Sequence, residues 1–222
     1  KNFKHRLVPF VELDTVNING VRHYVMPDGV TKLKSVTSIL SEKMDKTALL
    51  EWRKKVGEEE ANKISTQAAR RGTSIHKMAE RYILNEENIY EKEMPVNIES
   101  FKSIKEILDN HVDNILGIEL PLYNRTLKCA GRTDLVAEFD GTLSIIDFKT
   151  SRKLKKAEWI ESYFLQSTCY AMMFSWIYKI SVPQIVIIIT VDNEKTPQTF
   201  VRKTEDYVAR VLEIFADLQL SK

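Results

Sequence analysis

The sequence predicts an α/β (α+β) protein in which helices flank a central mixed β-sheet, and three stretches carry this prediction. Two runs of alternating apolar residues flank Asp140-Gly141, the dipeptide that a two-residue type I′ hairpin turn prefers. Residues 185–191 form a continuous β-branched run, which is typical of a strand buried on both faces. Residues 157–180 between them have the apolar content of a packed helix, so that strand, helix and strand make a right-handed βαβ unit.

The other elements follow from turn residues and apolar spacing. Asn19-Gly20 predicts a β-hairpin over residues 7–26. Residues 70–73 interrupt a helical region and predict a new helix over 73–84, with Thr73 or Ser74 as its N-cap. The further predicted elements are helices at 47–56, 58–69, 98–116 (ended by Gly117) and 204–220, a surface loop at 85–97, and a strand at 118–123 that carries Glu119 and has Pro121 at an edge or bend.

The composition is that of an ordinary globular protein, with 43% hydrophobic and 29% charged residues in a chain of 222. We expect a single domain with an N-terminal β-hairpin arm (1–34), a helical region (35–116) and a sheet core with closing helices (117–222). Because the net charge is only +2, any nucleic-acid footprint must be local. The two cysteines, Cys129 and Cys169, are too few for a disulfide framework or a four-thiolate iron–sulfur cluster. No apolar run reaches membrane-span length, so no membrane association is expected.

The hairpin around Asp140-Gly141 places charged residues opposite one another. With a type I′ turn, Phe139 pairs with Thr142, and Asp134 lies directly across from Asp147 on the face that also carries Arg132 and Lys149. Leu135, Ile146 and Phe148 then lie on the other face. Opposed side chains have Cβ atoms about 5 Å apart, where like charges are destabilising. Carboxylate oxygens suit Mg²⁺ or Mn²⁺, so a divalent ion is the natural compensation.

A solvated strand face with ordinary ion pairs is the alternative interpretation of these residues. The apolar run at 143–148 instead indicates a covered strand, in which an unpartnered Asp is costly, and this favours the metal site.

Other polar residues leave two interpretations open. The basic trio Arg53, Lys54 and Lys55 is either a solvated helix face or a phosphate contact. His76, in the first turn of its predicted helix, is by default a surface or capping residue, although a helix N-terminus flanked by Arg70 and Arg71 is also a good phosphate site. Gln166 and Tyr170 lie four residues apart and share a helix face, where a buried amide–phenol pair or ordinary core packing is the simplest explanation.

Five motifs occur in a characteristic order: RRGTSIH (70–76), the Glu119 strand, GRTDLVAEFDG (131–141), IIDFKTS (145–151) and Gln166-x-x-x-Tyr170. Together they resemble the PD-(D/E)XK nucleases of the RecB-like exonuclease branch, which has mitochondrial and phage members. The resemblance covers residues 35–191 and implies a restriction-endonuclease-like core with a helical arch or clamp. Asp147 stands where many members have Glu, and the four-cysteine cluster of some relatives is absent from the sequence, so no iron–sulfur cluster is expected.

The resemblance also implies a role for each residue. His76, Asp134, Asp147 and the backbone carbonyl of Phe148 would bind one or two Mg²⁺ or Mn²⁺ ions, and Glu119 would act on the metal-bound water. Lys149 would orient or deprotonate the attacking water and stabilise the transition-state phosphate, while Gln166 and Tyr170 would position the scissile strand or Lys149. The expected DNA-binding residues are Arg53, Arg70, Arg71, Thr150, Ser151, Arg152 and Lys153. Trp52, Trp159 and Tyr163 could stack on single-stranded bases, with core packing as the alternative for each.

These roles predict a Mg²⁺-dependent DNA exonuclease that acts on single-stranded ends in DNA replication, recombination or repair, with proteins of those processes as further partners. The alternatives are an endonuclease of the same fold and a catalytically inactive module that binds DNA ends. The expected compartment is the host cytoplasm for a phage-encoded protein, or else the mitochondrial matrix.

Overall fold

A mixed β-sheet organises the molecule in a computed structural model, which describes residues 1–220 and the side chains of residues 1–216. The strand order is β1-β2-β3-β5-β6-β7-β8, and β4 (Val112–Asn124) pairs with β5 (Cys129–Phe139) off this path. As predicted, β5 and β6 (Thr142–Ser151) form a hairpin in which Phe139 pairs with Thr142. Asp140 and Gly141 have φ values of 49° and 75°, as a type I′ turn requires.

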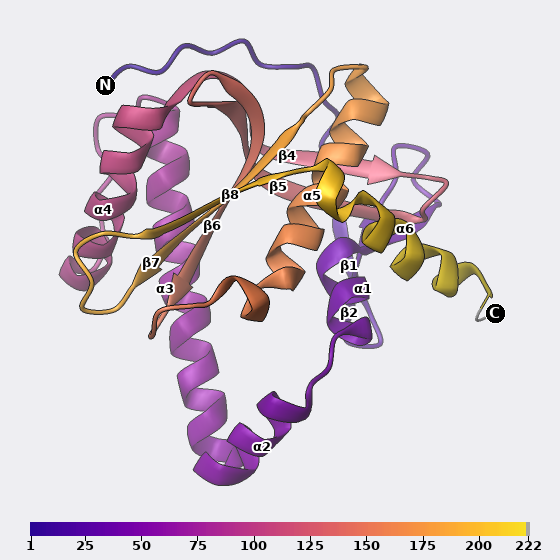
Figure 1. Cartoon of the computed structure of the whole chain (residues 1–222), viewed down its shortest axis with the longest axis horizontal. Helices are drawn as coiled ribbons and strands as arrows, with labels where there is room; N and C mark the ends of the chain where they lie inside the picture. Colours follow the sequence, from indigo (N-terminus) through magenta and orange to yellow (C-terminus); the bar gives the residue numbers. More distant parts are fainter. Residues whose placement is uncertain (221–222) are drawn as a thin grey trace.

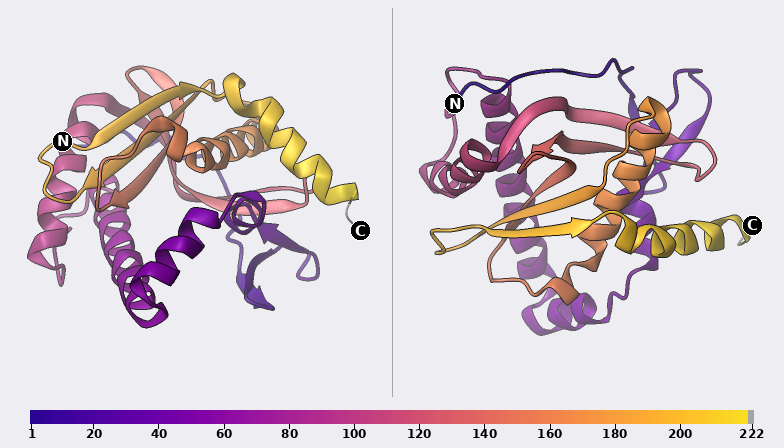
Figure 2. Two further views of the ribbon diagram at one scale, coloured as in Figure 1. Left: turned by 60° about the horizontal axis from the view of Figure 1, so that its bottom comes forward. Right: turned by 45° about the horizontal axis from the view of Figure 1, so that its top comes forward.

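Helices cover both faces of the sheet (Figure 1; Figure 2). One face packs on α3 (Glu58–Ile83) and α4 (Pro95–His111), and its core includes Leu135, Ile146 and Phe148, which the predicted alternation had assigned to one face. The other face packs on α1 (Val36–Lys43), α5 (Glu161–Tyr178) and α6 (Glu205–Leu220). The chain passes from β6 through the 3₁₀ turn η1 (Ala157–Trp159) and α5 to β7 (Gln184–Val191), which pairs with β6 in parallel as expected of a βαβ unit.

The N-terminal hairpin joins the main sheet. Strands β1 (Thr15–Ile18) and β2 (Val21–Val25) flank Asn19-Gly20 as predicted. A strand that the pattern did not predict, β3 (Lys32–Ser35), continues from β2 and pairs in parallel with Cys129 and Ala130 of β5. Because β4 occupies the other edge of β5 at these residues, β3 lies on the same edge of β5 as β6 does. The β5–β6 ladder ends at Leu135↔Ile146, so β5 changes partner around Asp134.

The break predicted at residues 70–73 is wrong, because α3 is one 26-residue helix. A single helical glycine such as Gly72 costs only about 1 kcal/mol relative to Ala, which tertiary packing offsets. The Thr73 hydroxyl donates back to the Ala69 carbonyl oxygen at 3.1 Å instead of capping a new helix. His76 therefore lies in the second half of a continuous helix, and there is no helix N-terminus beside Arg70 and Arg71 to bind phosphate.

The helix predicted at 98–116 is also wrong at its C-terminal end. α4 stops at His111, and β4 begins at Val112 with a register shift between Asp113 and Gly117. The irregularity includes Asn114, whose φ is 44°. Val112 and Ile115 are both buried, so a bulged strand places them inward at the i, i+3 spacing that also suits a helix.

The C-terminal part of the fold contains one further unpredicted strand, β8 (Gln198–Lys203), antiparallel to β7. Helix α2 (Thr47–Val56) has the predicted bounds. Residues of α2 and of positions 58–70 of α3 are exposed or half-buried except Ala61, and together they project from the sheet as a helical arch (Figure 1). Among the described residues, no helix combines the length and apolarity that crossing a bilayer needs.

Gly131 permits close packing between β5 and α5, which yields a stability test. A Cβ at Gly131 would lie 2.5 Å from Cε1 of Tyr170, whereas one at Gly72 would meet nothing within 4 Å. Gly131→Ala is therefore expected to lower the free energy of unfolding by about 1–3 kcal/mol through overpacking. Gly72→Ala should raise it by about 0.5–1 kcal/mol, since alanine favours the helix. Urea denaturation of both variants checks this, and an unaffected Gly131→Ala protein would contradict the packing described.

Candidate active site

The candidate site lies where β5 and β6 separate, and five elements supply its side chains. Asp134 comes from β5, Asp147 and Lys149 from β6, and Glu119 from β4. His76 comes from α3 and Gln166 from α5, the helices on opposite faces of the sheet. The structure thus brings together these six of the residues that sequence reasoning assigned to metal binding and catalysis, whereas Tyr170 packs against Gly131 of β5.

Asp134 and Asp147 are not a ladder pair, since the β5–β6 pairing ends one position earlier. Instead, an Asp134 carboxylate oxygen accepts the backbone N–H of Phe148 at 2.8 Å, so a side chain holds the two strands together where their backbones separate. The carboxylate that β4 places beside Asp134 is Glu119. It lies between Ile118 and Leu120, which pair with Leu135 and Thr133 on either side of Asp134.

His76, Glu119 and Asp134 form a cluster in which one ligand atom from each lies within 4.8 Å of the others. His76 Nδ1 is 3.4 Å from an Asp134 oxygen, and Nε2 is 2.7 Å from the Phe148 carbonyl oxygen. Both ring nitrogens therefore face acceptors, which favours the imidazolium. Burial opposes this charge, but the Asp134 carboxylate outweighs it and raises the pKa of His76 to about 9.

The acidic members of the cluster have opposite pKa shifts. For Asp134, burial favours the neutral acid, but His76 and Lys149 hold its pKa below the usual value. For Glu119, burial and the neighbouring Asp134 carboxylate raise the pKa to about 7. Near neutral pH the cluster thus contains an ionised Asp134, an imidazolium and a Glu119 poised to gain or lose a proton.

Asp147 and Lys149 form the second half of the site. Asp147 is 2% exposed, pairs with the Lys149 ammonium and accepts a hydrogen bond of 3.2 Å from the Gln166 amide. Burial raises the pKa of Asp147 to about 6, and Lys149 only partly offsets it. The pKa of Lys149 is raised despite its burial, because Asp147 and Asp134 stabilise the ammonium. Its Nζ also lies 5.2 Å from the centre of the Tyr163 ring.

The donors fit a hard divalent ion. His76, Glu119 and Asp134, whose ligand atoms lie within 4.8 Å of one another, supply carboxylate oxygens and one nitrogen, a set compatible with Mg²⁺ or Mn²⁺. Asp147 and the Phe148 carbonyl, which faces His76 Nε2 at 2.7 Å, are the further oxygens predicted for the ion. The charges of Asp134 and Asp147 are offset by His76 and Lys149. A divalent ion would supply the same positive charge, so the residues present could hold it.

Tyr170 has a different environment from Gln166. Tyr170 is 2% exposed and packs against Gly131, where an added Cβ would come within 3.0 Å of two ring carbons and the hydroxyl oxygen, whereas Gln166 contacts Asp147 directly. Tyr170 therefore packs against β5, one turn of α5 away from the contact of Gln166 with Asp147.

Two cavities border the site. One of about 470 Å³ opens over His76 and Glu119 and is lined also by Gly72, Thr73, Lys77 and Glu80. The second, of about 450 Å³, lies between α3 and the end of β6. It is lined by four of the predicted DNA-binding residues, Arg71, Thr150, Ser151 and Arg152. Arg70 and Lys153 are exposed nearby in sequence, whereas Arg53 lies on the arch and is bound to Glu58 and Asn62.

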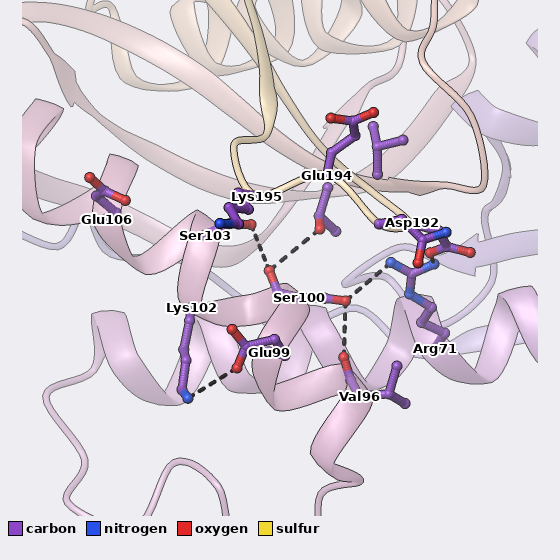
Figure 3. Close-up of a pocket in the computed structure, with 13 residues that line it drawn as sticks. Arg71, Val96, Glu99, Ser100, Lys102, Ser103, Glu106, Asp192, Glu194 and Lys195 are labelled. Carbon is purple, nitrogen blue, oxygen red and sulfur yellow. Dashed lines mark hydrogen bonds and ion pairs between the residues drawn. The ribbon is translucent and has the colours of Figure 1, made fainter.

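A cavity of about 740 Å³ lies outside the His76–Asp134 cluster (Figure 3). Arg71 lines both this cavity and the one beside β6, and its guanidinium pairs with Asp192 and donates to the Ser100 hydroxyl at 3.2 Å. Sequence reasoning missed Asp192. Its position directly after β7, at the carboxyl end of a strand parallel to β6, is the signal that could have indicated it.

Comparison with known proteins gives matches at three levels. A family model described as PD-(D/E)XK nuclease superfamily matches residues 35–219. The chain is 30% identical over 130 residues to mitochondrial genome maintenance exonuclease 1 of Mus musculus, and 29% identical over 144 residues to that of Homo sapiens. These matches cover 55% and 61% of this chain but 38% and 40% of the relatives, so the chain spans about two fifths of their length. A crystal structure from Eubacterium rectale aligns with a TM-score of 0.42 and 11% identity over 65% of this chain and 63% of that chain.

The pKa of Glu119 predicts how the stability of the metal-free protein changes with pH. Between the ordinary value of 4.5 and about 7, the folded state retains a proton that the unfolded state has lost, so the free energy of unfolding falls as pH rises. Glu119→Gln removes this titration. In EDTA, we expect the variant to match the parent near pH 4 and to exceed its free energy of unfolding by about 1–3 kcal/mol at pH 8.

Urea denaturation at the two pH values measures the difference, and Glu87→Gln in an exposed segment is the control. A pH-independent effect of Glu119→Gln would show that Glu119 does not titrate as described.

Proposed function

The chain belongs to the PD-(D/E)XK nuclease superfamily, as the sequence motifs predicted, and on this basis we propose that it is a Mg²⁺-dependent DNA exonuclease that prefers single-stranded ends. The observation that carries the proposal is the pairing of Asp134 with His76 and of Asp147 with Lys149 at one point in the sheet. The mouse and human relatives are both named exonucleases of mitochondrial genome maintenance, which supports a substrate of DNA and a role in its replication or repair.

The reaction proposed is hydrolysis of a phosphodiester by in-line attack of water, which forms one P–O bond and breaks another. A bound Mg²⁺ would lower the pKa of water and offset the charge that develops on the phosphate oxygens. Asp134, Asp147, His76 and the Phe148 carbonyl would hold the ion. Glu119, whose pKa lies near 7, can accept the proton that the attacking water loses.

Lys149 would change its partner during this reaction. Its ammonium pairs with Asp147, and the Gln166 amide donates to the other Asp147 oxygen. With a cation bound at Asp147, the ammonium would be available to the scissile phosphate, and its raised pKa keeps it protonated. Because alanine at position 149 also leaves the buried Asp147 without its partner, the folding of Lys149→Ala is checked by circular dichroism before its activity is compared.

The arch supports the preference for single strands with free ends. Its exposed helices stand over the side of the molecule to which β6 leads (Figure 2). The cavity lined by Arg71 and Arg152 adjoins the end of that strand. Backbone contacts from such residues carry no sequence information, which suits a processive or end-directed nuclease. An endonuclease of the same fold is the second candidate.

The central test uses Lys149→Ala with Lys203→Ala as control, because Lys203 is exposed and pairs with Gln184, the first residue of β7, away from the site. With Mg²⁺, we expect the lysine 149 variant to degrade a labelled single-stranded oligonucleotide about 10²- to 10⁴-fold more slowly than the parent, and the control to stay within a few-fold. EDTA should abolish degradation by the parent. A Lys149→Ala protein as active as the parent refutes the site assignment.

Substrate topology separates the two candidate functions. The parent should leave a closed single-stranded DNA circle intact while it degrades the linear form of the same sequence, as gel electrophoresis of both products would show. Rapid cutting of the circle would establish the endonuclease instead.

A further inference from the structure

Trp159 is 62% exposed, contrary to the core packing that sequence reasoning favoured for it. It is one of 3 tryptophans in the chain and lies in η1, between β6 and α5. An indole this exposed leaves a large aromatic face that a ligand can cover.

The backbone that carries Trp159 is fixed on both sides. The next residue, Ile160, is 1% exposed and packs in the core with α5, and the Trp159 N–H donates to the Lys156 carbonyl oxygen at 3.0 Å. Lys155 exchanges two hydrogen bonds with the Gln198 side chain, of 2.7 and 2.9 Å. The indole is therefore presented from an ordered turn, so its binding face is already in place before a ligand arrives.

The position of Trp159 relates it to the active site. The segment that carries it starts at Ser151 and Arg152, which line the cavity beside β6, and leads into α5, whose Gln166 contacts Asp147. In Figure 1 and in the right-hand view of Figure 2, the segment of residues 152–160 lies on the same side of the molecule as the arch. A strand that passes from the site along this cavity would meet Trp159.

The charges around the indole indicate which class of ligand fits it. Arg152, Lys153 and Lys156 are exposed in the same segment, and Lys156 Nζ lies 5.2 Å from the centre of the indole ring. An aromatic face beside cations matches a nucleotide, whose base stacks on the ring while its phosphate binds the cations. In a duplex the base faces are covered by their neighbours, so only an unpaired base can use this surface.

We propose that Trp159 is a stacking platform for an unpaired base of the DNA strand whose phosphate lies at Asp134 and Asp147. The inference rests on the proposed nuclease function and specifies its substrate as single-stranded near the site. Each base stacked on an aromatic side chain contributes about 1–3 kcal/mol, so loss of the indole should weaken binding of single strands about 5- to 150-fold.

Trp176 provides a matched control. It is also 62% exposed, and Lys179 Nζ lies 4.7 Å from the centre of its ring, so its size, exposure and cation contact resemble those of Trp159. It lies near the C-terminal end of α5, ten residues beyond Gln166, and therefore about 15 Å along the helix from the site contact. A general effect of removing a surface tryptophan would appear in both variants.

Binding is measured first, without catalysis, by fluorescence anisotropy of a labelled oligo-dT 20-mer in EDTA. We expect Trp159→Ala to raise the Kd about 5- to 150-fold. Trp159→Phe should restore most of the affinity, and Trp176→Ala should have the Kd of the parent. The dependence of Kd on salt should keep its slope in Trp159→Ala, because phosphate contacts remain, and binding of a blunt duplex should not change.

Hydrolysis with Mg²⁺ is measured next, on oligonucleotides that carry one abasic position moved along the strand. At one place in the strand, an abasic position should raise the KM of the parent to the value that Trp159→Ala shows with the intact strand. The same abasic position should leave the KM of Trp159→Ala unchanged. Equal Kd values for Trp159→Ala and the parent, or equal losses in Trp159→Ala and Trp176→Ala, would overturn the stacking proposal while nuclease activity stands. A parent without nuclease activity would overturn the proposed function, and the anisotropy result would still decide whether Trp159 binds bases.

Discussion

The structure depends on the neutralisation of two carboxylates held in the middle of a covered sheet. Asp134 and Asp147 cannot both remain charged there unless each has a cation within contact distance, because burial of an unpaired charge costs several kcal/mol. His76 serves Asp134 and Lys149 serves Asp147. Lys149 comes from the same strand as its partner, but His76 must come from outside the sheet. This requirement fixes the position of α3 against the Phe148 carbonyl.

The continuity of α3 links His76 to the arch. The second half of the helix is packed in the core through Ile75, Met78 and Ala79, while residues 58–70 are exposed apart from Ala61 and half-buried Ile64. The Arg71–Asp192 ion pair ties the helix to the end of β7 at the junction of these halves. A 26-residue helix is about 39 Å long, and the same helix contributes to the arch and positions His76. A break at residues 70–73, as the glycine suggested, would have separated the two.

The features of the fold that the sequence predicts are those that depend on residues close together along the chain. The Asp140-Gly141 turn determined the hairpin register, and alternation then assigned Leu135, Ile146 and Phe148 correctly to one face. The partner change of β5 at Asp134 was not predictable, because it requires β3, a strand of four residues whose pairing is set by tertiary contacts. Two other predictions failed for a similar reason. The glycine signal for a break in α3 and the helical spacing of residues 112–116 were both weaker than packing against the sheet.

The separation of β6 from β5 also explains why so much chemistry lies on one short stretch of chain. Beyond Ile146, the β5 edge of β6 is held by the Asp134 side chain rather than by backbone, while the other edge stays paired with β7 as far as Ser151↔Val191. One edge of β6 is thus rigid and the other is open to groups from α3. In the proposed function, Asp147 and Lys149 on β6 would face a metal and a phosphate, residues 150–152 would face the adjoining DNA backbone, and Trp159 in η1 would face a base. The order of these residues along the chain would then be the order in which a nucleic-acid strand meets them.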